Sequence, residues 1–129
     1  MQEVHSFEYA IIRVVPKVER EEFLNVGVIL YCKSKKFLHT IINLDQQRLR
    51  SLSEKMDLAD LFEHLKSLEQ ISMGTSKLSP IARLDIASRF RWLTASRSTI
   101  VQTSRVHPGI CTDPMETIKK LYNELVLCS

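Results

Sequence analysis

One long apolar run constrains the fold more than any other part of this sequence. In Phe23–Cys32 only Asn25 and Gly27 interrupt a series of aliphatic and aromatic residues. A run of this kind, without polar alternation, is typical of a central strand covered on both faces. Glycine inside a strand marks a bulge or a close backbone approach, so we interpret Gly27 in this way, with Asn25 bonded to a neighbouring turn. We expect Val28 and Leu30 to be among the most buried residues.

Two further runs flank this central strand. Phe7–Val15 is rich in β-branched and aromatic residues, and Pro16 stops strand pairing after it. Phe37–Leu44 follows the polar turn Lys33–Lys36 and reads as the second arm of a hairpin. Because successive strands joined by short links usually pair with each other, the first third of the chain predicts an antiparallel sheet.

Capping residues divide the middle of the chain into helices. Asp45 precedes a short helix, and Asp57 begins a longer amphipathic helix that Gly74 ends. Ser79, followed by a proline, begins a third helix. The apolar positions of this third helix are Ile81, Leu84 and Phe90.

The last part of the chain predicts two short strands and a final helix. We expect strands at Trp92–Ala95 and Ser98–Val106, on either side of a turn at Arg97. Asp113, a following proline and Glu116 predict the start of a C-terminal amphipathic helix. Together the elements predict an α+β fold: one domain over residues 1–129, with a single, mostly antiparallel sheet of about five strands packed by helices.

Composition excludes several classes of protein. Eighteen basic and fifteen acidic residues give a formal net charge of +3, which is too small to predict nucleic-acid or membrane binding. No apolar run is long enough to span a membrane, and the N-terminus is too polar for a signal peptide. The cysteines lack CxxC spacing and the histidines are scattered, so no zinc site is predicted. No Gly-rich loop occurs that could bind a phosphate. We therefore expect a cytoplasmic protein without metal or cofactor, with reduced thiols at Cys32, Cys111 and Cys128.

Positive charge is concentrated in one segment. No carboxylate occurs in residues 86–112, although acids and bases are interspersed elsewhere. Guanidinium groups match the geometry of carboxylates and phosphates, so this segment suits an anion or an acidic partner. Its basic residues are Arg89, Arg91, Arg97, Arg105 and His107.

A strand through this segment would gather polar side chains on one face. Side chains alternate along a strand, so an unbroken strand would point the odd-numbered polar residues from Arg97 to His107 the same way. The alternative is a solvated face, or arginines neutralised by acids such as Glu8, Glu21 or Glu22. The predicted binding surface comprises Arg89, Arg97, Ser98, Thr99, Arg105 and His107.

A small enzyme is one alternative function for the same segment. Pro108 and Gly109 would place His107 and Cys111 across a tight turn, as a nucleophilic pair that Asp113 orients. However, Cys111 also fits a small buried hydrophobe, and Asp113 is already explained as a helix cap.

Nucleic-acid binding is another alternative. Trp92 and Phe90 lie beside arginines and could stack on bases. A single Trp near the junction of two elements is more often a core anchor, and the basic excess is local. Nucleic acid is therefore a partner that the sequence allows but does not favour.

Three segments also carry a resemblance to a known family. They are Tyr9–Pro16, Glu22–Leu30 and Ser88–Gln102, the last of which continues into Val106–Pro114. On these segments the chain resembles, over essentially its full length, the bacterial domain of unknown function 3037 (DUF3037). The resemblance implies a small protein often encoded beside a HipA-like kinase, and hence a partner or regulator. We therefore expect a non-enzymatic accessory or regulatory protein that engages a protein partner through its Arg-rich surface.

Overall fold

A computed structural model describes residues 3–16, 21–53, 57–75, 79–95 and 99–127. Within these ranges the chain forms one antiparallel sheet of five strands in the order β3-β2-β1-β4, with β5 also paired to β1. The strands are β1 (His5–Val14), β2 (Leu24–Cys32), β3 (Phe37–Ile42), β4 (Val101–Thr103) and β5 (His107–Cys111). The helices are α1 (Gln46–Leu52), α2 (Leu58–Met73), the 3₁₀ helix η2 (Pro80–Arg83), α3 (Ile86–Leu93), α4 (Pro114–Tyr122) and the π-helix η3 (Asn123–Leu127).

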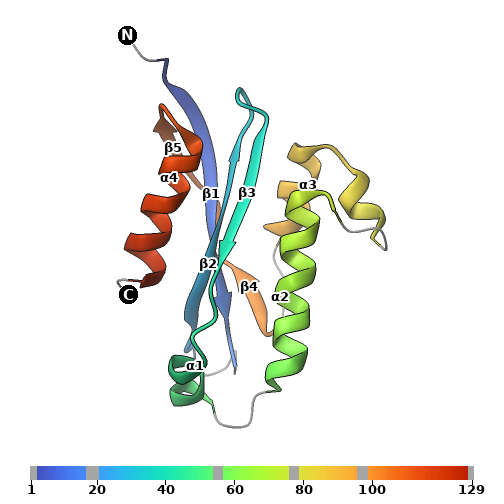
Figure 1. Cartoon of the computed structure of the whole chain (residues 1–129), viewed down its shortest axis with the longest axis vertical. Helices are drawn as coiled ribbons and strands as arrows, with labels where there is room; N and C mark the ends of the chain where they lie inside the picture. Colours follow the sequence, from blue (N-terminus) through green and yellow to red (C-terminus); the bar gives the residue numbers. More distant parts are fainter. Residues whose placement is uncertain (1–2, 17–20, 54–56, 76–78, 96–98, 128–129) are drawn as a thin grey trace.

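The sheet lies between two helical layers. Figure 1 shows α2 and α3 on one side of the sheet and α4 on the other. The alternation of β1 divides the core between these layers: Ala10, Ile12 and Val14 belong to the cluster under α2 and α3, whereas Phe7 and Tyr9 belong to the cluster under α4. The predicted α+β architecture is confirmed.

The predicted central strand is also confirmed. Val28 and Leu30 are fully buried in β2, which pairs with β1 on one side and β3 on the other. The β1–β2 register shifts immediately beside Gly27, as a bulge requires. A Cβ atom at Gly27 would lie 2.6 Å from the carbonyl oxygen of Ile41, so only glycine fits against β3 there. Both expectations for this glycine therefore hold.

The predicted helix caps are found in the structure. The side chains of Asp45, Asp57, Ser79 and Asp113 accept hydrogen bonds from backbone N–H groups in the first turns of α1, α2, η2 and α4. Gly74 ends α2 in the left-handed conformation, with φ of 71°. Each helix in the described ranges is too short or too polar to traverse a lipid bilayer.

The helix predicted after Ser79 is divided into two. The short η2 ends before Asp85, which begins α3 by accepting a hydrogen bond from the backbone N–H of Ser88 at 2.7 Å. Hydrogen bonds from Ser88 lower the pKa of Asp85, which holds this cap in its charged form. The prediction of a single helix after Ser79 misses this second cap, and the strand predicted at Trp92–Ala95 follows from that error.

The predicted strand at Trp92–Ala95 is wrong. Trp92 and Leu93 form the last turn of α3, and Thr94 caps its C-terminal end. Phe90 and Leu93 are both buried, which is the i, i+3 spacing of a helix and not the alternation of a strand. Phe90 packs against Tyr31 of β2, with 5.3 Å between ring centroids, and so fixes α3 on the sheet.

The predicted strand at Ser98–Val106 is shorter than expected. Only Val101–Thr103 forms a strand, and Ser98 lies outside the described residues. The predicted turn at Pro108 and Gly109 is instead part of β5, which pairs with β1. A Cβ atom at Gly109 would lie 2.4 Å from the Phe7 ring, so the aromatic ring requires this glycine.

Ser104 joins β4 to β5 along the edge of β1. Its backbone N–H donates to the carbonyl of Ile11 at 2.8 Å, and its Oγ accepts from the N–H of Ile11 at 2.9 Å. The same hydroxyl donates to the carbonyl of Arg105 at 2.9 Å. The register to β1 differs by one residue between β4 and β5, so the N–H of Ile11 lacks a backbone acceptor there and the serine hydroxyl takes that place.

Candidate functional site

Arg89, the first arginine of the basic segment, supports the fold. Its guanidinium donates to the carbonyl of Leu84 at 2.8 Å, and it lies against the C-terminal end of α2, where a Cβ atom at Gly74 would be 3.2 Å from Nη1. A cation at this end of a helix is favoured by the helix dipole. The Nε atom is buried and has no hydrogen-bond partner among the described residues. Arg89 therefore faces the junction of α2, η2 and α3.

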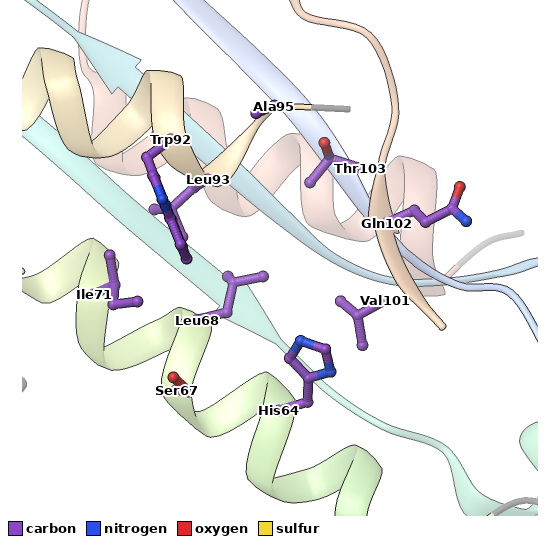
Figure 2. A pocket seen from close by; sticks show the side chains of 10 residues that line it. All are labelled: His64, Ser67, Leu68, Ile71, Trp92, Leu93, Ala95, Val101, Gln102 and Thr103. Atoms are coloured by element: carbon purple, nitrogen blue, oxygen red, sulfur yellow. The ribbon is translucent and has the colours of Figure 1, made fainter. Parts of the chain in front are cut away.

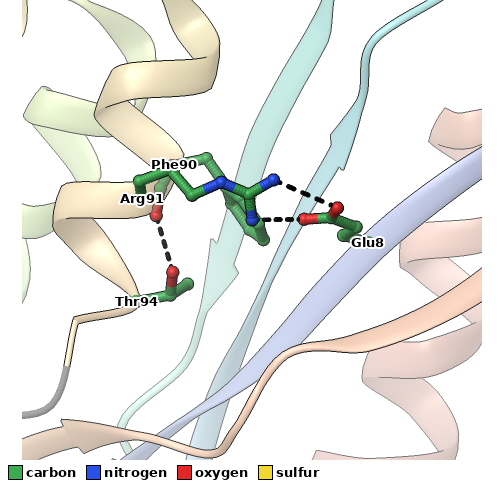
Figure 3. Close-up of polar contacts among 4 residues, drawn as sticks. All are labelled: Glu8, Phe90, Arg91 and Thr94. Carbon is green, nitrogen blue, oxygen red and sulfur yellow. Dashed lines mark hydrogen bonds and ion pairs between the residues drawn. The ribbon is translucent and has the colours of Figure 1, made fainter.

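Arg91 forms a two-pronged ion pair with Glu8 (Figure 3). The two nitrogen–oxygen distances are 2.6 and 3.2 Å, and the hydrogen bond to Glu8 raises the pKa of Arg91. The side chains are 59% and 33% exposed, so solvent screens the pair and its contribution to stability is at most about 1 kcal/mol. Glu8 neutralises this arginine, which is the alternative to ligand binding expected for the arginines of the basic segment.

The polar residues predicted to share one strand face are separated by the break at Ser104. Thr103 lies opposite Ile12, on the side of α2 and α3, whereas His107 lies opposite Tyr9, on the side of α4. The condition for that prediction, an unbroken strand from Arg97 to His107, is therefore not met.

The remaining members of the predicted surface lie at different places. Thr99 is exposed, and its hydroxyl donates to the carbonyl of Val101 at 2.6 Å. Arg105 is exposed in the link between β4 and β5, and no described residue forms a hydrogen bond or ion pair with its guanidinium. His107 stacks on Tyr9, with 5.2 Å between ring centroids. Arg97 and Ser98 lie outside the described residues.

The His107 and Cys111 side chains do not form a nucleophilic pair. They lie at opposite ends of β5, four residues apart, which is about 13 Å along an extended strand. Cys111 is buried, and burial raises the pKa of its thiol, whereas an activated thiol requires a lowered pKa. Asp113 is used as the cap of α4. Within the described ranges, no three His, Cys, Asp or Glu side chains are close enough to hold a metal ion.

A cavity of about 80 Å³ lies between α2, the end of α3 and β4 (Figure 2). Leu68, Leu93 and Val101 form its apolar wall, while His64 and Trp92 point into it from α2 and α3. None of the described lining residues carries a carboxylate. Sites for cofactors and nucleotides measure roughly 300–1,000 Å³, so this cavity is too small for such molecules. It matches the size of an aliphatic side chain.

The outer edge of β4 lies beside this cavity. Hydrogen bonds from Val15 N to Ile100 O and from Ser104 N to Ile11 O fix which β4 residues bond to β1. Bonded and non-bonded pairs alternate in an antiparallel ladder, so the backbone groups of Val101 and Thr103 point away from β1. Of these groups, the Val101 carbonyl is bonded to Thr99. Within the described residues, the N–H of Val101 and both backbone groups of Thr103 have no partner.

On the opposite face, residues from two of the segments behind the family resemblance meet. The Arg13 Nε donates to the Asn25 side chain at 3.3 Å, and its guanidinium lies 4.3 Å from the centre of the Phe23 ring. Asn25 donates to the carbonyl of Leu125 at 3.1 Å, so it binds the C-terminal π-helix, where we had expected a turn. Burial lowers the pKa of Arg13. These contacts attach η3 to the sheet.

Sequence reasoning missed the cavity and its lining on α2. The sequence patterns assigned no role to His64 or Ser67 of α2, and they placed Trp92 on a strand. The signal that was available is Asp85, one residue before Ile86, because a capping carboxylate there places Trp92 on a helix facing α2.

Comparison with known proteins gives a match to a protein family. A family described as "Protein of unknown function (DUF3037)" matches residues 9–126. No curated protein and no solved structure matched the chain.

Proposed function

Because the chain belongs to the DUF3037 family, whose description states no activity, we propose from its surface that it is a non-catalytic binding protein. It engages an acidic region of a protein partner through the basic segment of residues 86–112. The partner that the family resemblance suggests is a HipA-like kinase, and the setting is the cytoplasm, where Cys32 and Cys111 stay reduced.

The observation that carries this proposal is the state of Arg105. Arg89 and Arg91 are engaged within the fold, whereas Arg105 is exposed and has no partner among the described residues. No carboxylate is present in residues 86–112 to neutralise it locally. An unpaired guanidinium in a segment that contains no carboxylate attracts an acidic partner at long range and forms a charge-assisted hydrogen bond on contact.

The geometry weakens the two alternative functions. The nucleic-acid hypothesis rests on two aromatic side chains, and Phe90, fully buried against Tyr31, cannot stack on a base. Trp92, which is 37% exposed, is the one of the two that remains accessible. Cys111 has the raised thiol pKa and the distance from His107 described above, which do not suit a nucleophile. A protein partner is therefore favoured over a nucleic acid or a small substrate.

The test measures binding to a purified HipA-like kinase from the same genome by biolayer interferometry, at low and at high salt. We expect Arg105→Glu, and in parallel Arg97→Glu, to weaken binding roughly fivefold or more at low salt, mainly through the association rate. Lys120→Glu is the matched control, since it makes the same charge change on the exposed side of α4.

Equal binding by wild type and both Arg variants would contradict the proposal. A single-stranded oligoribonucleotide of mixed sequence serves as the second probe. If it binds with an affinity that falls steeply with salt while the kinase does not bind, the protein is a nucleic-acid binder instead.

A further inference from the structure

The free edge of β4 offers backbone groups that an extended chain can use. The N–H of Val101 and the N–H and C=O of Thr103 point away from β1 and have no partner among the described residues. Backbone polar groups in folded proteins are almost always hydrogen-bonded, to protein or to water. An edge of this kind is a template for a further strand.

A helix runs alongside this edge and forms the second wall of a groove. Figure 2 shows His64 of α2 pointing towards Val101 of β4, and Trp92 of α3 closing one end. The exposed side chain of Ser67 lies on the same wall. A groove between an edge strand and a helix is an arrangement in which domains bind extended peptides by strand addition, with side-chain pockets that give specificity.

The size of the cavity limits which side chain enters it. Its volume of about 80 Å³ exceeds the roughly 10–15 Å³ that one water molecule needs, and it is smaller than the roughly 150 Å³ cavity that accommodates benzene. The wall formed by Leu68, Leu93 and Val101 is apolar. A small aliphatic side chain therefore fits, whereas an aromatic side chain does not.

The charge beside the groove limits the rest of the peptide. Arg105 follows Thr103 by two residues and is exposed, while the described residues lining the cavity include no carboxylate. A peptide that pairs with β4 therefore carries its small aliphatic residue opposite Val101 and an acidic residue within reach of Arg105.

We infer that the groove between β4 and α2 binds an extended acidic segment of the protein partner as an additional strand, with a small aliphatic side chain in the cavity. This inference rests on the proposed function and names the mode of that binding. The free β4 edge binds the backbone of the segment, the cavity accepts its aliphatic side chain and Arg105 pairs with its acidic residue.

The test begins with a phage-displayed library of random dodecapeptides, panned against the whole protein. The enriched peptides are synthesised with a fluorescent label and measured by fluorescence anisotropy. We expect them to share a Val, Ile, Leu or Ala beside an Asp or Glu. N-methylation of the peptide backbone should reduce affinity only at alternate positions, because successive amides of a strand point to opposite sides.

The protein variant is Thr103→Pro, which removes an N–H that β1 does not use, and its control is Thr103→Val, which keeps that N–H. The proline variant should bind the enriched peptide roughly three- to tenfold more weakly, because the loss corresponds to one hydrogen bond, whereas the valine variant should bind it as wild type does. Circular dichroism checks that both variants fold. Should the proline variant unfold, the N-methyl scan on wild type decides the question alone.

Three results would overturn the inference: no peptide is enriched, N-methylation shows no alternation, or the proline and valine variants bind equally. A dimer in gel filtration that Thr103→Pro converts to monomer would assign the groove to a second copy of this chain. If Arg105→Glu weakens kinase binding while Thr103→Pro has no effect on it, the proposed function stands and strand addition is wrong.

Discussion

Replacing Ser104 with alanine tests how the basic segment is held on the sheet. The hydroxyl of Ser104 accepts the N–H of Ile11 at 2.9 Å in a buried setting. Alanine leaves that donor unsatisfied, which costs about 1–3 kcal/mol. The total stability of a domain is about 5–15 kcal/mol, so the loss is a substantial fraction. For a chain of this length we expect the melting temperature to fall by roughly 3–12 °C.

The matched control for this prediction is Ser72→Ala. Ser72 is also buried, but its hydroxyl donates to the carbonyl of Glu69 in the same helix, 2.7 Å away. Alanine is the better helix former, and no N–H loses its partner, so the change should be less than about 1 kcal/mol. Urea unfolding followed by circular dichroism gives both free energies. Equal losses in the two variants would refute the role assigned to Ser104.

Three other substitutions or measurements follow from the structure. Gly27→Ala should lower the unfolding free energy by about 1–3 kcal/mol in the same assay, because the added Cβ would lie 2.6 Å from a carbonyl oxygen of β3. An unchanged midpoint of urea unfolding would mean that β2 and β3 move apart without cost. Cys111 should react with iodoacetamide more slowly than free glutathione at neutral pH, measured by mass spectrometry, because burial raises the pKa of its thiol; fast alkylation would revive the nucleophile hypothesis. The stability contributed by this buried neutral thiol is complete below the usual thiol pKa of about 8.5 and is lost as the pH rises through the raised pKa of the folded state. Glu8→Gln should change stability by less than about 1 kcal/mol, and a larger loss would show that the pair with Arg91 is less screened than its exposure indicates.

Local sequence patterns predicted the first half of the fold well. The run Phe23–Cys32 is apolar on both sides of the strand, so it predicts a strand covered on both faces. The caps Asp45 and Asp57 bond to backbone N–H groups within one helical turn, so they are recognisable from neighbouring residues. Such features depend on residues that are close in sequence. Gly27 was predictable for a similar reason, because a glycine in an apolar strand has few explanations.

The segment after Asp85 was harder to predict because distant contacts determine it. Phe90 and Leu93 are buried by the sheet and α2, and this burial selects helix where the sequence also allows strand. The break at Ser104 depends on a hydrogen bond to Ile11, which is 93 residues away in the chain. The cavity beside β4 likewise exists only after α2, α3 and the sheet have packed, so the local signal at Asp85 places Trp92 on a helix but does not indicate the cavity itself.

Hydrogen exchange of the free protein and of its complex with the HipA-like kinase tests the central claim most directly. The amides of Val101 and Thr103 point away from β1, so in the free protein they should exchange faster than the amide of Gln102, which faces β1. In the complex we expect exchange to slow at Val101, Thr103 and Arg105. Slowing confined to α4, or no slowing at any residue of the basic segment, would contradict the account.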